Sequence, residues 1–540
     1  MHLNILDSDN YNISGCSYVK MILSIFLETC LIIYPAFSSN NQKIYIIISI
    51  ILTIIITFIN ILYGRIFHSY FPLSLIGEYH NLLGLTDSIL SIININDSII
   101  IIFPILQLLL LQNSVSEKVL FHFNFNIPKL SVVTIFIIVL EIFSTYRSFT
   151  WKAFIPCRII QTINREIESY NYEKELYTFR NGIINTYIRD CWNYIYSYKK
   201  ELSYETIIEI KSKSKREYNH TVHHKNNIIF IIVESLMTFP IDLYIDGTEI
   251  TPTLNKLKKE GYYNPNMISQ IEKGMSSDGQ FIYFTGLLPH KNNVTIVNFI
   301  DNVYHGLGKF ASRKNMKTIM VVPTTKKFWH QEEACIIYGI EDLWSKENYY
   351  QTQDINYIDE WLNDEQIFNY SRWLCEQTSS PFFLTILTSS MHMPYYNKFE
   401  QAKIQISSSK NSYEYINYLQ KVNYMDYQLG VFIQYLKDKG LYDNSTIIIA
   451  SDHKVPFEFK EVNNYNIPLF ITNCKQSESN DTIGQIDIYP TILDLLNISD
   501  TTWRGVGYSI YSKKGNERIK YNEQFEISNL ILESNFFKDY

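Results

Sequence analysis

The segment NIIFIIVES, residues Asn227–Ser235, decides the fold. It contains an unbroken apolar run that ends at a carboxylate, Glu234. Its length and its β-branched content are typical of a strand that is buried on both faces. Four further runs share these properties: KTIMVVP (317–323), FFLTILTSS (382–390), STIIIASD (445–452) and IPLFITN (467–473). The sequence therefore predicts a sheet whose strands are buried on both faces.

The stretches between these runs have the periodicity of amphipathic helices, most clearly at residues 251–261, 412–440 and 486–498. Strands that alternate with helices predict an α/β domain in which a mostly parallel sheet lies between helices. Ligands of such folds bind at the carboxyl ends of the strands. Glu234, His392 and the pair Asp452-His453 all fall at such positions.

The polar residues at these strand ends favour metal-assisted chemistry. Glu234 and the pair Asp452-His453 offer carboxylate and imidazole ligands, and EKGMSSDGQ (272–280) offers hydroxyls on a turn that contains glycines. Each has an ordinary alternative: a salt bridge or helix cap for the acids, an N-cap for the serines, and a structural role for His392. Their joint placement at strand ends is what favours a catalytic site.

The front of the chain has a different composition. Apolar runs at residues 18–37, 44–63, 98–112 and 129–146 predict about four membrane spans within a transmembrane region, 1–147. Pro104 interrupts the third run, for which a buried or interfacial helix is the alternative. Aromatic and charged residues over 148–225 predict a helical linker at the bilayer surface, with a solvated linker as the alternative.

Residues 226–540 then form the predicted extracytoplasmic catalytic domain. No removable signal peptide precedes the apolar runs, so we expect a multi-pass protein of the inner or plasma membrane. Over its 540 residues the chain carries a net charge of -7 with mixed signs. That balance gives no basic surface for nucleic acid, which is not an expected partner.

Eight motifs, in this order, resemble the lipoteichoic acid synthase branch of the sulfatase and alkaline phosphatase superfamily. The resemblance covers about residues 226–509, and the membrane front half is similar in kind. The motifs are Glu234-Ser235, Thr251–Leu257, Gly274–Asp278, Phe328-Trp329, Ser390–Pro394, Ser451–His453, Ile467–Leu469 and Gln485–Leu496.

The resemblance implies one divalent metal ion, Mn²⁺ or Zn²⁺, held by Glu234, Asp452, His453 and the oxygen of a nucleophile. The nucleophile that it implies is Ser276, where the family usually has threonine, and His392 is implied to assist catalysis. Further along, it implies a substrate-binding segment made by Lys326, Lys327, Trp329 and His330.

The chain departs from the synthases in the same segment. Val322-Pro323 stands in place of a His-Gly pair, and Gln331 in place of an arginine that would clamp a phosphate with two hydrogen bonds. Lys326 or Lys327 could replace that arginine only in part. The transferred group is therefore either phosphoglycerol or phosphoethanolamine.

These residues together predict transfer of a phospho-headgroup through a covalent phosphoserine. The expected partners are a membrane phospholipid as donor, an envelope glycan or glycolipid as acceptor, and the bilayer itself. One alternative is a hydrolase, a sulfatase or phosphodiesterase, although Ser-Asp-Gly-Gln after Ser276 lacks the pattern of formylglycine sulfatases. A second alternative is an inactive, membrane-anchored envelope protein.

Overall fold

The structure is a computed structural model. It describes residues 42–67, 69–100, 174–195, 200–214, 225–353, 361–396, 399–406, 411–474, 477–499, 503–512 and 521–539, with Met21, Ser24, Ile25, Glu28 and Ile102. Of the predicted spans, those at 18–37, 98–112 and 129–146 lie wholly or mostly outside these residues.

The described helices are α3 (Gln42–Phe67), η1 (Leu73–Gly84), α4 (Thr86–Ser91), η2 (Ile95–Asp97), α9 (Lys174–Asn181), α10 (Ile183–Ile195), α11 (Tyr204–Ser214), α12 (Pro252–Glu260), α13 (Ser276–Thr285), α14 (Thr295–Asn298), α15 (Leu307–Arg313), η4 (Phe328–His330), α16 (Gln331–Tyr338), α17 (Lys346–Gln353), α18 (Asp364–Gln377), α19 (Tyr413–Asp438), η5 (Gln485–Asp487), α20 (Ile488–Leu495), α21 (Tyr521–Ser534) and α22 (Phe536–Asp539). The strands are β1 (Asn227–Val233), β2 (Tyr244–Ile245), β3 (Thr248–Glu249), β4 (Tyr262–Ile268), β5 (Lys317–Val321), β6 (Asp342–Trp344), β7 (Phe382–Leu387), β8 (Ser445–Ser451), β9 (Ile467–Ile471), β10 (Ser477–Glu478) and β11 (Ile483–Gly484).

The chain divides into two compact units, of which the first comprises residues 1–76 and 89–197. Its helix α3 is long and apolar enough over Ile47–Phe67 to cross a membrane, and among the described residues it is the one such helix. It corresponds to the predicted span at 44–63. Large apolar side chains along it are exposed, as a lipid-facing helix requires: Ile47, Ile48, Ile51, Leu52 and Ile55.

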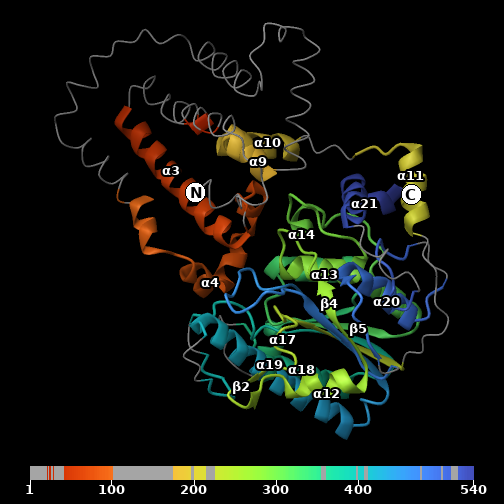
Figure 1. Cartoon of the computed structure of the whole chain (residues 1–540). Coiled ribbons are helices and arrows are strands. Elements are labelled where there is room, and N and C mark those ends of the chain that lie inside the picture. Colours follow the sequence, from red (N-terminus) through yellow and green to blue (C-terminus); the bar gives the residue numbers. More distant parts are fainter. Residues whose placement is uncertain are drawn as a thin grey trace. The chain divides into compact units, whose positions relative to one another are not determined.

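The second unit comprises residues 77–88 and 198–540 and contains the sheet. The strands lie in the order β10-β4-β9-β8-β1-β7-β5-β6, and β11 pairs with β4 (Figure 1). Among the described strands of this sheet, only the pairs that β9 makes with β4 and β8 are antiparallel; the separate β2–β3 pair is antiparallel as well. The predicted α/β class with a mostly parallel sheet is therefore confirmed, and the five predicted strands form as β1, β5, β7, β8 and β9.

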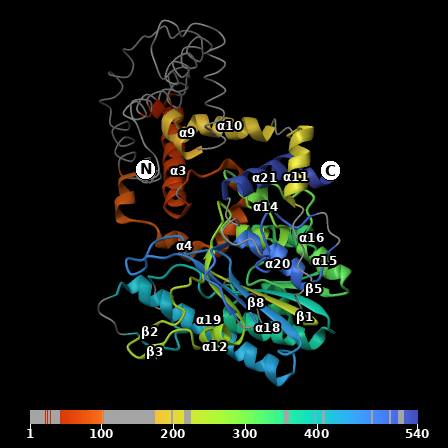
Figure 2. The ribbon, with the colours of Figure 1, turned by 45° about the vertical axis from the view of Figure 1, so that its right-hand side comes forward.

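Helices cover both faces of this sheet. Helices α12, α18 and α19 lie on one face, and α13, α15, α16 and α20 lie on the other (Figures 1 and 2). Alternate residues of β1 pack against the two helix layers, because successive side chains of a strand point to opposite faces of the sheet. Ile229 and Ile231 belong to the core cluster with α19, while Phe230 packs its ring 5.3 Å from that of Tyr283 on α13. This double burial explains why β1 is apolar at every position from Ile228 to Val233.

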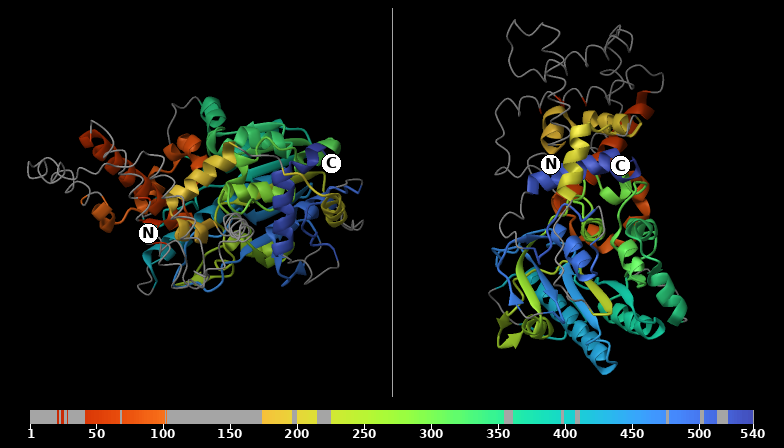
Figure 3. Two further views of the ribbon diagram at one scale, coloured as in Figure 1. Left: turned by 90° about the horizontal axis from the view of Figure 1, so that it is seen from above. Right: turned by 90° about the vertical axis from the view of Figure 1, so that its right-hand side faces the viewer.

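The register of the central strands determines where polar side chains meet. The parallel strands β8, β1 and β7 are neighbours in that order, and Val233 of β1 pairs with Ser451 of β8. The next residue on each strand, Glu234 and Asp452, therefore lies at the same edge of the sheet. Strand β7 ends at Leu387 and leads toward His392 at this edge; Figure 3 shows the same layers from two further directions.

Candidate active site

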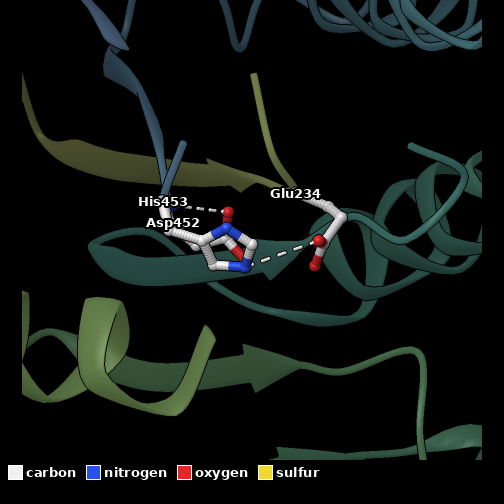
Figure 4. A group of neighbouring side chains, drawn as sticks. All are labelled: Glu234, Asp452 and His453. Atoms are coloured by element: carbon white, nitrogen blue, oxygen red, sulfur yellow. Dashed lines mark hydrogen bonds and ion pairs between the residues drawn. The ribbon is translucent and has the colours of Figure 1, made fainter. Parts of the chain in front are cut away.

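Three side chains at the carboxyl ends of β1 and β8 form a buried cluster. Glu234, Asp452 and His453 each offer one ligand atom, and these atoms lie within 4.8 Å of one another. The Nε2 atom of His453 is 3.6 Å from Oε1 of Glu234 and 3.5 Å from Oδ2 of Asp452. Figure 4 shows the Glu234 carboxylate turned toward the imidazole of His453.

The hydroxyl of Ser276 joins this cluster from the first residue of α13. Its Oγ donates to Oε2 of Glu234 at 3.2 Å and lies 3.1 Å from Nε2 of His453. The neighbouring Ser277 is buried and donates instead to the carbonyl of Gly274 at 2.7 Å. Of the two adjacent serines, Ser276 is therefore the one whose hydroxyl faces the cluster.

A strained turn presents Ser276 in this way. Met275, just before it, has φ 48° and ψ -121°, a backbone conformation that costs a non-glycine residue on the order of 1–3 kcal/mol. Asp278 holds the turn from inside, since its Oδ2 accepts from the backbone N–H groups of Glu272 and Gly274 at 3.0 and 2.8 Å. Burial raises the pKa of Asp278 to about 7.

Backbone and side-chain donors fix the acids in place. Oδ1 of Asp452 accepts from the N–H groups of Ser235 and His453 at 2.8 and 2.7 Å. The hydroxyl of Ser235 donates to Oε1 of Glu234 at 2.8 Å. Nδ1 of His453 lies 2.7 Å from the carbonyl oxygen of Lys454, so it carries the proton and leaves the lone pair of Nε2 directed at the cluster.

The electrostatics of the cluster favour a cation. Burial raises the pKa of Asp452 to about 7, with a further contribution from the charge of Glu234, whereas His453 opposes the shift. Burial alone would lower the pKa of His453, but the carboxylates of Asp452 and Glu234 raise it. A divalent cation would balance these crowded charges. One imidazole nitrogen and oxygens from two carboxylates and Ser276 are a donor set that fits Zn²⁺ or Mn²⁺.

Two residues to which sequence reasoning gave no role hold the Asp452 backbone. Nε2 of Gln485 donates to the carbonyl of Asp452 at 2.7 Å, while its Oε1 accepts from the backbone N–H of Gln270 at 2.7 Å. Gly279 brings α13 against the same peptide, because a Cβ there would collide with the Asp452 carbonyl oxygen. The position of Gln485 in the eighth motif was the signal that could have singled it out.

His392 lies on the segment after β7. Its Nδ1 is 2.7 Å from the carbonyl oxygen of Met393, and its ring is 4.6 Å from that of Trp361. Burial lowers the pKa of His392 to about 4, so the imidazole is neutral near pH 7. Lys421 of α19, which sequence reasoning missed, donates to the His392 carbonyl at 2.6 Å, and burial lowers its pKa to about 8.

The four residues of the predicted substrate-binding segment lie on the turn between β5 and α16. Lys327 is exposed, Lys326 is partly exposed, and Trp329 lies in η4. Nε2 of His330 is 2.9 Å from Oε1 of Glu78, which leaves this nitrogen unavailable to a substrate. Among the contacts of the described residues, no side chain of these four touches the metal-ligand cluster.

The positions that depart from the synthases are buried in the structure. Val322 has no exposed surface, and Gln331 is 3% exposed at the first residue of α16. Neither side chain therefore replaces the absent histidine or arginine at the surface of the site.

The site combines a buried cluster of carboxylates and an imidazole with a serine at a helix N-terminus, at the strand ends of an α/β fold. This arrangement is typical of the class of enzymes that act on phosphoesters or sulfoesters. The sulfatase family model matches residues 226–498, and the chain belongs to this family.

Within the family, the chain is similar to lipoteichoic acid synthases, as the motifs predicted. It is 30% identical over 324 residues to "Lipoteichoic acid synthase" of Staphylococcus aureus strain USA300, covering 56% of this chain and 50% of the relative. The chain thus spans about half the length of the curated relatives it matches. The crystal structure of a lipoteichoic acid synthase from Listeria monocytogenes matches with a TM-score of 0.52 at 20% identity, over 62% of this chain and 98% of that one, and supports the fold.

Proposed function

We propose that this protein transfers a phospho-headgroup, phosphoglycerol or phosphoethanolamine, from a membrane phospholipid to an envelope glycan or glycolipid. The observation that carries the proposal is the Ser276 hydroxyl, which contacts both Glu234 and His453 within the candidate metal-ligand cluster. Similarity to lipoteichoic acid synthases supports this reaction class.

Glu234, Asp452, His453 and Ser276 are the residues that would hold one divalent ion, Mn²⁺ or Zn²⁺. When bound, such an ion favours the ionised serine and offsets negative charge on the phosphoryl group. In the first step the Ser276 oxygen forms a bond to phosphorus while the bond to the diacylglycerol oxygen breaks. The serine loses its proton, the diacylglycerol oxygen gains one, and the phosphoglycerol or phosphoethanolamine group remains on Ser276 as a phosphodiester.

His392 acts in the second step of the proposed reaction. With its proton on Nδ1 and directed at Met393, the neutral imidazole offers the lone pair of Nε2 as an acceptor. It takes the proton of the acceptor hydroxyl as that oxygen forms a bond to phosphorus. The bond between phosphorus and the Ser276 oxygen breaks, and that oxygen regains a proton, which restores the serine. Because burial lowers its pKa to about 4, His392 is unprotonated throughout the neutral range and keeps this lone pair free.

The proposed setting is a multi-pass membrane protein whose catalytic domain faces outward. The candidate span in α3 supports an anchor in the bilayer. A catalytic domain tethered to the bilayer meets its lipid donor at a high local concentration without further contacts.

The test is to incubate the purified full chain with Mn²⁺ or Zn²⁺ and labelled phosphatidylglycerol or phosphatidylethanolamine. We expect diacylglycerol release from one of these lipids, and mass spectrometry should find the corresponding phospho-headgroup attached to Ser276. Ser276→Ala should abolish both signals, whereas Ser277→Ala, one residue away, should retain them, and Ser276→Thr should remain active.

Release of diacylglycerol without transfer to any added acceptor would favour the phosphodiesterase alternative. Release from neither lipid would refute the proposal. A phosphate adduct on Ser277 in place of Ser276 would refute the assignment of the nucleophile.

A further inference from the structure

A short segment from the front of the chain belongs to the catalytic unit. Residues 77–88 are grouped with residues 198–540, although they precede the matched family range by more than a hundred positions. The segment covers the second part of η1 and the start of α4. Its contacts within that unit are concentrated on the predicted substrate-binding turn.

Two buried side chains of this segment bind the turn. Oε1 of Glu78 lies 2.9 Å from Nε2 of His330, and Oδ1 of Asn81 accepts from the backbone N–H of Trp329 at 3.0 Å. Asn81 also donates to Oε2 of Glu78 at 3.0 Å, which ties the two together. Glu78 is 9% exposed and Asn81 is 3% exposed, so these bonds are shielded from competing water.

A third contact comes from His80, which lies between Glu78 and Asn81 in the sequence. Nε2 of His80 lies 3.0 Å from the carbonyl oxygen of Lys327. The segment thus reaches three positions of the turn, Lys327, Trp329 and His330, the first two of them through the backbone.

The turn has a conformation that needs such support. Trp329 and His330 both have positive φ angles, 48° and 51°, and each costs a bulky non-glycine residue roughly 1–2 kcal/mol. Strained residues persist only where their surroundings hold them, and they concentrate at functional sites. The hydrogen bonds from Glu78 and Asn81 add to the local bond from the His330 N–H to the Lys327 carbonyl and hold these two residues from outside the turn.

The turn connects to His392 through aromatic rings in edge-to-face contact. The ring of Phe328 lies 5.1 Å from that of Trp361, which in turn lies 4.6 Å from His392. Segment 77–88 also contacts the residue next to His392, because the Ser88 hydroxyl donates to the carbonyl of Met393 at 3.2 Å. Segment 77–88 therefore contacts both the turn and the His392 segment.

We propose that Glu78 and Asn81 are positioning residues that hold the Phe328–His330 turn in its substrate-binding conformation. The substrate side of the site is then completed by a segment outside the matched family range. This inference rests on the proposed function and deepens it, since it assigns the support of donor-lipid binding to two residues that touch no metal ligand.

The experiment compares Glu78→Ala, Glu78→Gln and Asn81→Ala with the control Tyr79→Ala in the purified full chain. Tyr79 lies on the same segment, and its side chain is 72% exposed. One readout is the kinetics of diacylglycerol release, separated into KM and kcat. A second is the rate of trypsin cleavage after Lys326 and Lys327, followed by mass spectrometry, which needs no activity.

We expect Glu78→Ala to raise KM and the cleavage rate by about 10- to 100-fold, the effect of losing its charge-assisted hydrogen bond to the turn. Asn81→Ala should raise both by about 2- to 10-fold, the effect of losing its neutral hydrogen bond to the turn. Glu78→Gln keeps an acceptor for His330 and should restore most of the loss, whereas Tyr79→Ala should match the unmodified protein. Mn²⁺ affinity should be unchanged in every variant.

Equal KM and equal cleavage in Glu78→Ala and Tyr79→Ala would overturn the inference while leaving the proposed function standing. A parallel loss of kcat, Mn²⁺ affinity and thermal stability in Glu78→Ala would also overturn it, because that pattern is structural. If the unmodified protein releases no diacylglycerol, the proposed function fails, and trypsin cleavage still decides whether Glu78 holds the turn.

Discussion

Replacing Gly279 with alanine would test how closely α13 must approach the metal-ligand cluster. A Cβ at this position would lie 3.0 Å from the Cα and carbonyl carbon of Asp452, and closer still to its carbonyl oxygen. Carbon atoms pack at roughly 3.5–4.0 Å, so α13 or the Asp452 backbone must move by about 0.5–1 Å. That shift would increase the distance between the Ser276 hydroxyl and His453.

We expect Gly279→Ala to lower kcat for diacylglycerol release by up to about 100-fold, the cost of a misplacement near ~1 Å. Its free energy of unfolding should fall by about 1–3 kcal/mol, as in other overpacked cores. Both are measured on the full chain in detergent, by lipid turnover and by thermal unfolding. Gly77→Ala is the matched control, because no heavy atom lies within 4 Å of the Cβ that the alanine would add.

A fully active Gly279→Ala variant would refute this reasoning, since it would mean that the reaction does not depend on the spacing between α13 and Asp452. A variant that loses stability yet keeps its kcat would separate packing from catalysis and contradict the predicted displacement of Ser276.

Further substitutions address the support of the site and the fold. Gln485→Leu leaves the Asp452 carbonyl unpaired, so the free energy of unfolding should fall by about 1–3 kcal/mol and calorimetry should find weaker Mn²⁺ binding. The folded-state pKa of His392 is about 4, below its ordinary value. Its contribution to the free energy of unfolding is therefore complete above pH 6.5 and is lost as pH falls toward 4. His392→Gln should remove up to roughly 3 kcal/mol of that acid-induced loss in unfolding titrations. Arg504→Met leaves the buried Asp494 carboxylate without its ion pair, and thermal unfolding should report a loss of about 3–5 kcal/mol.

The sheet could be predicted from the sequence because its central strands are buried on both faces. β1 is apolar from Ile228 to Val233 and β8 from Ile447 to Ala450, and that pattern needs no knowledge of tertiary contacts. The placement of Glu234 and Asp452 at one edge followed from the rule that parallel strands end together. The register of Val233 with Ser451 is the physical basis of that success.

The choice between Ser276 and Ser277 depended on backbone geometry that the sequence does not encode locally. Met275 adopts a positive φ because Asp278 and the neighbouring strands hold the turn, and the resulting direction of each hydroxyl is a tertiary property. The family resemblance supplied Ser276, and the geometry of the turn explains it.

The partners of the substrate-binding turn could not be predicted at all. Glu78 and His330 are separated by 252 positions, and the surrounding apolar composition of residues 1–147 indicated only membrane spans. Polar side chains within an apolar region carry no periodic signal, so a residue such as Asn81 is found only through its contacts.

The pairing of β1 with β8 has a consequence for biosynthesis. The hydroxyl of Ser451 donates to the carbonyl of Val233, 218 residues earlier, so the two halves of the cluster of Glu234, Asp452 and His453 are made at very different times. A ribosome must translate past His453 before the nascent chain can form this cluster. Pairing between strands so far apart in the sequence is slow. The newly made domain therefore passes through an interval in which its acidic strand ends are synthesised but have not yet come together, so that no cation can balance their charge.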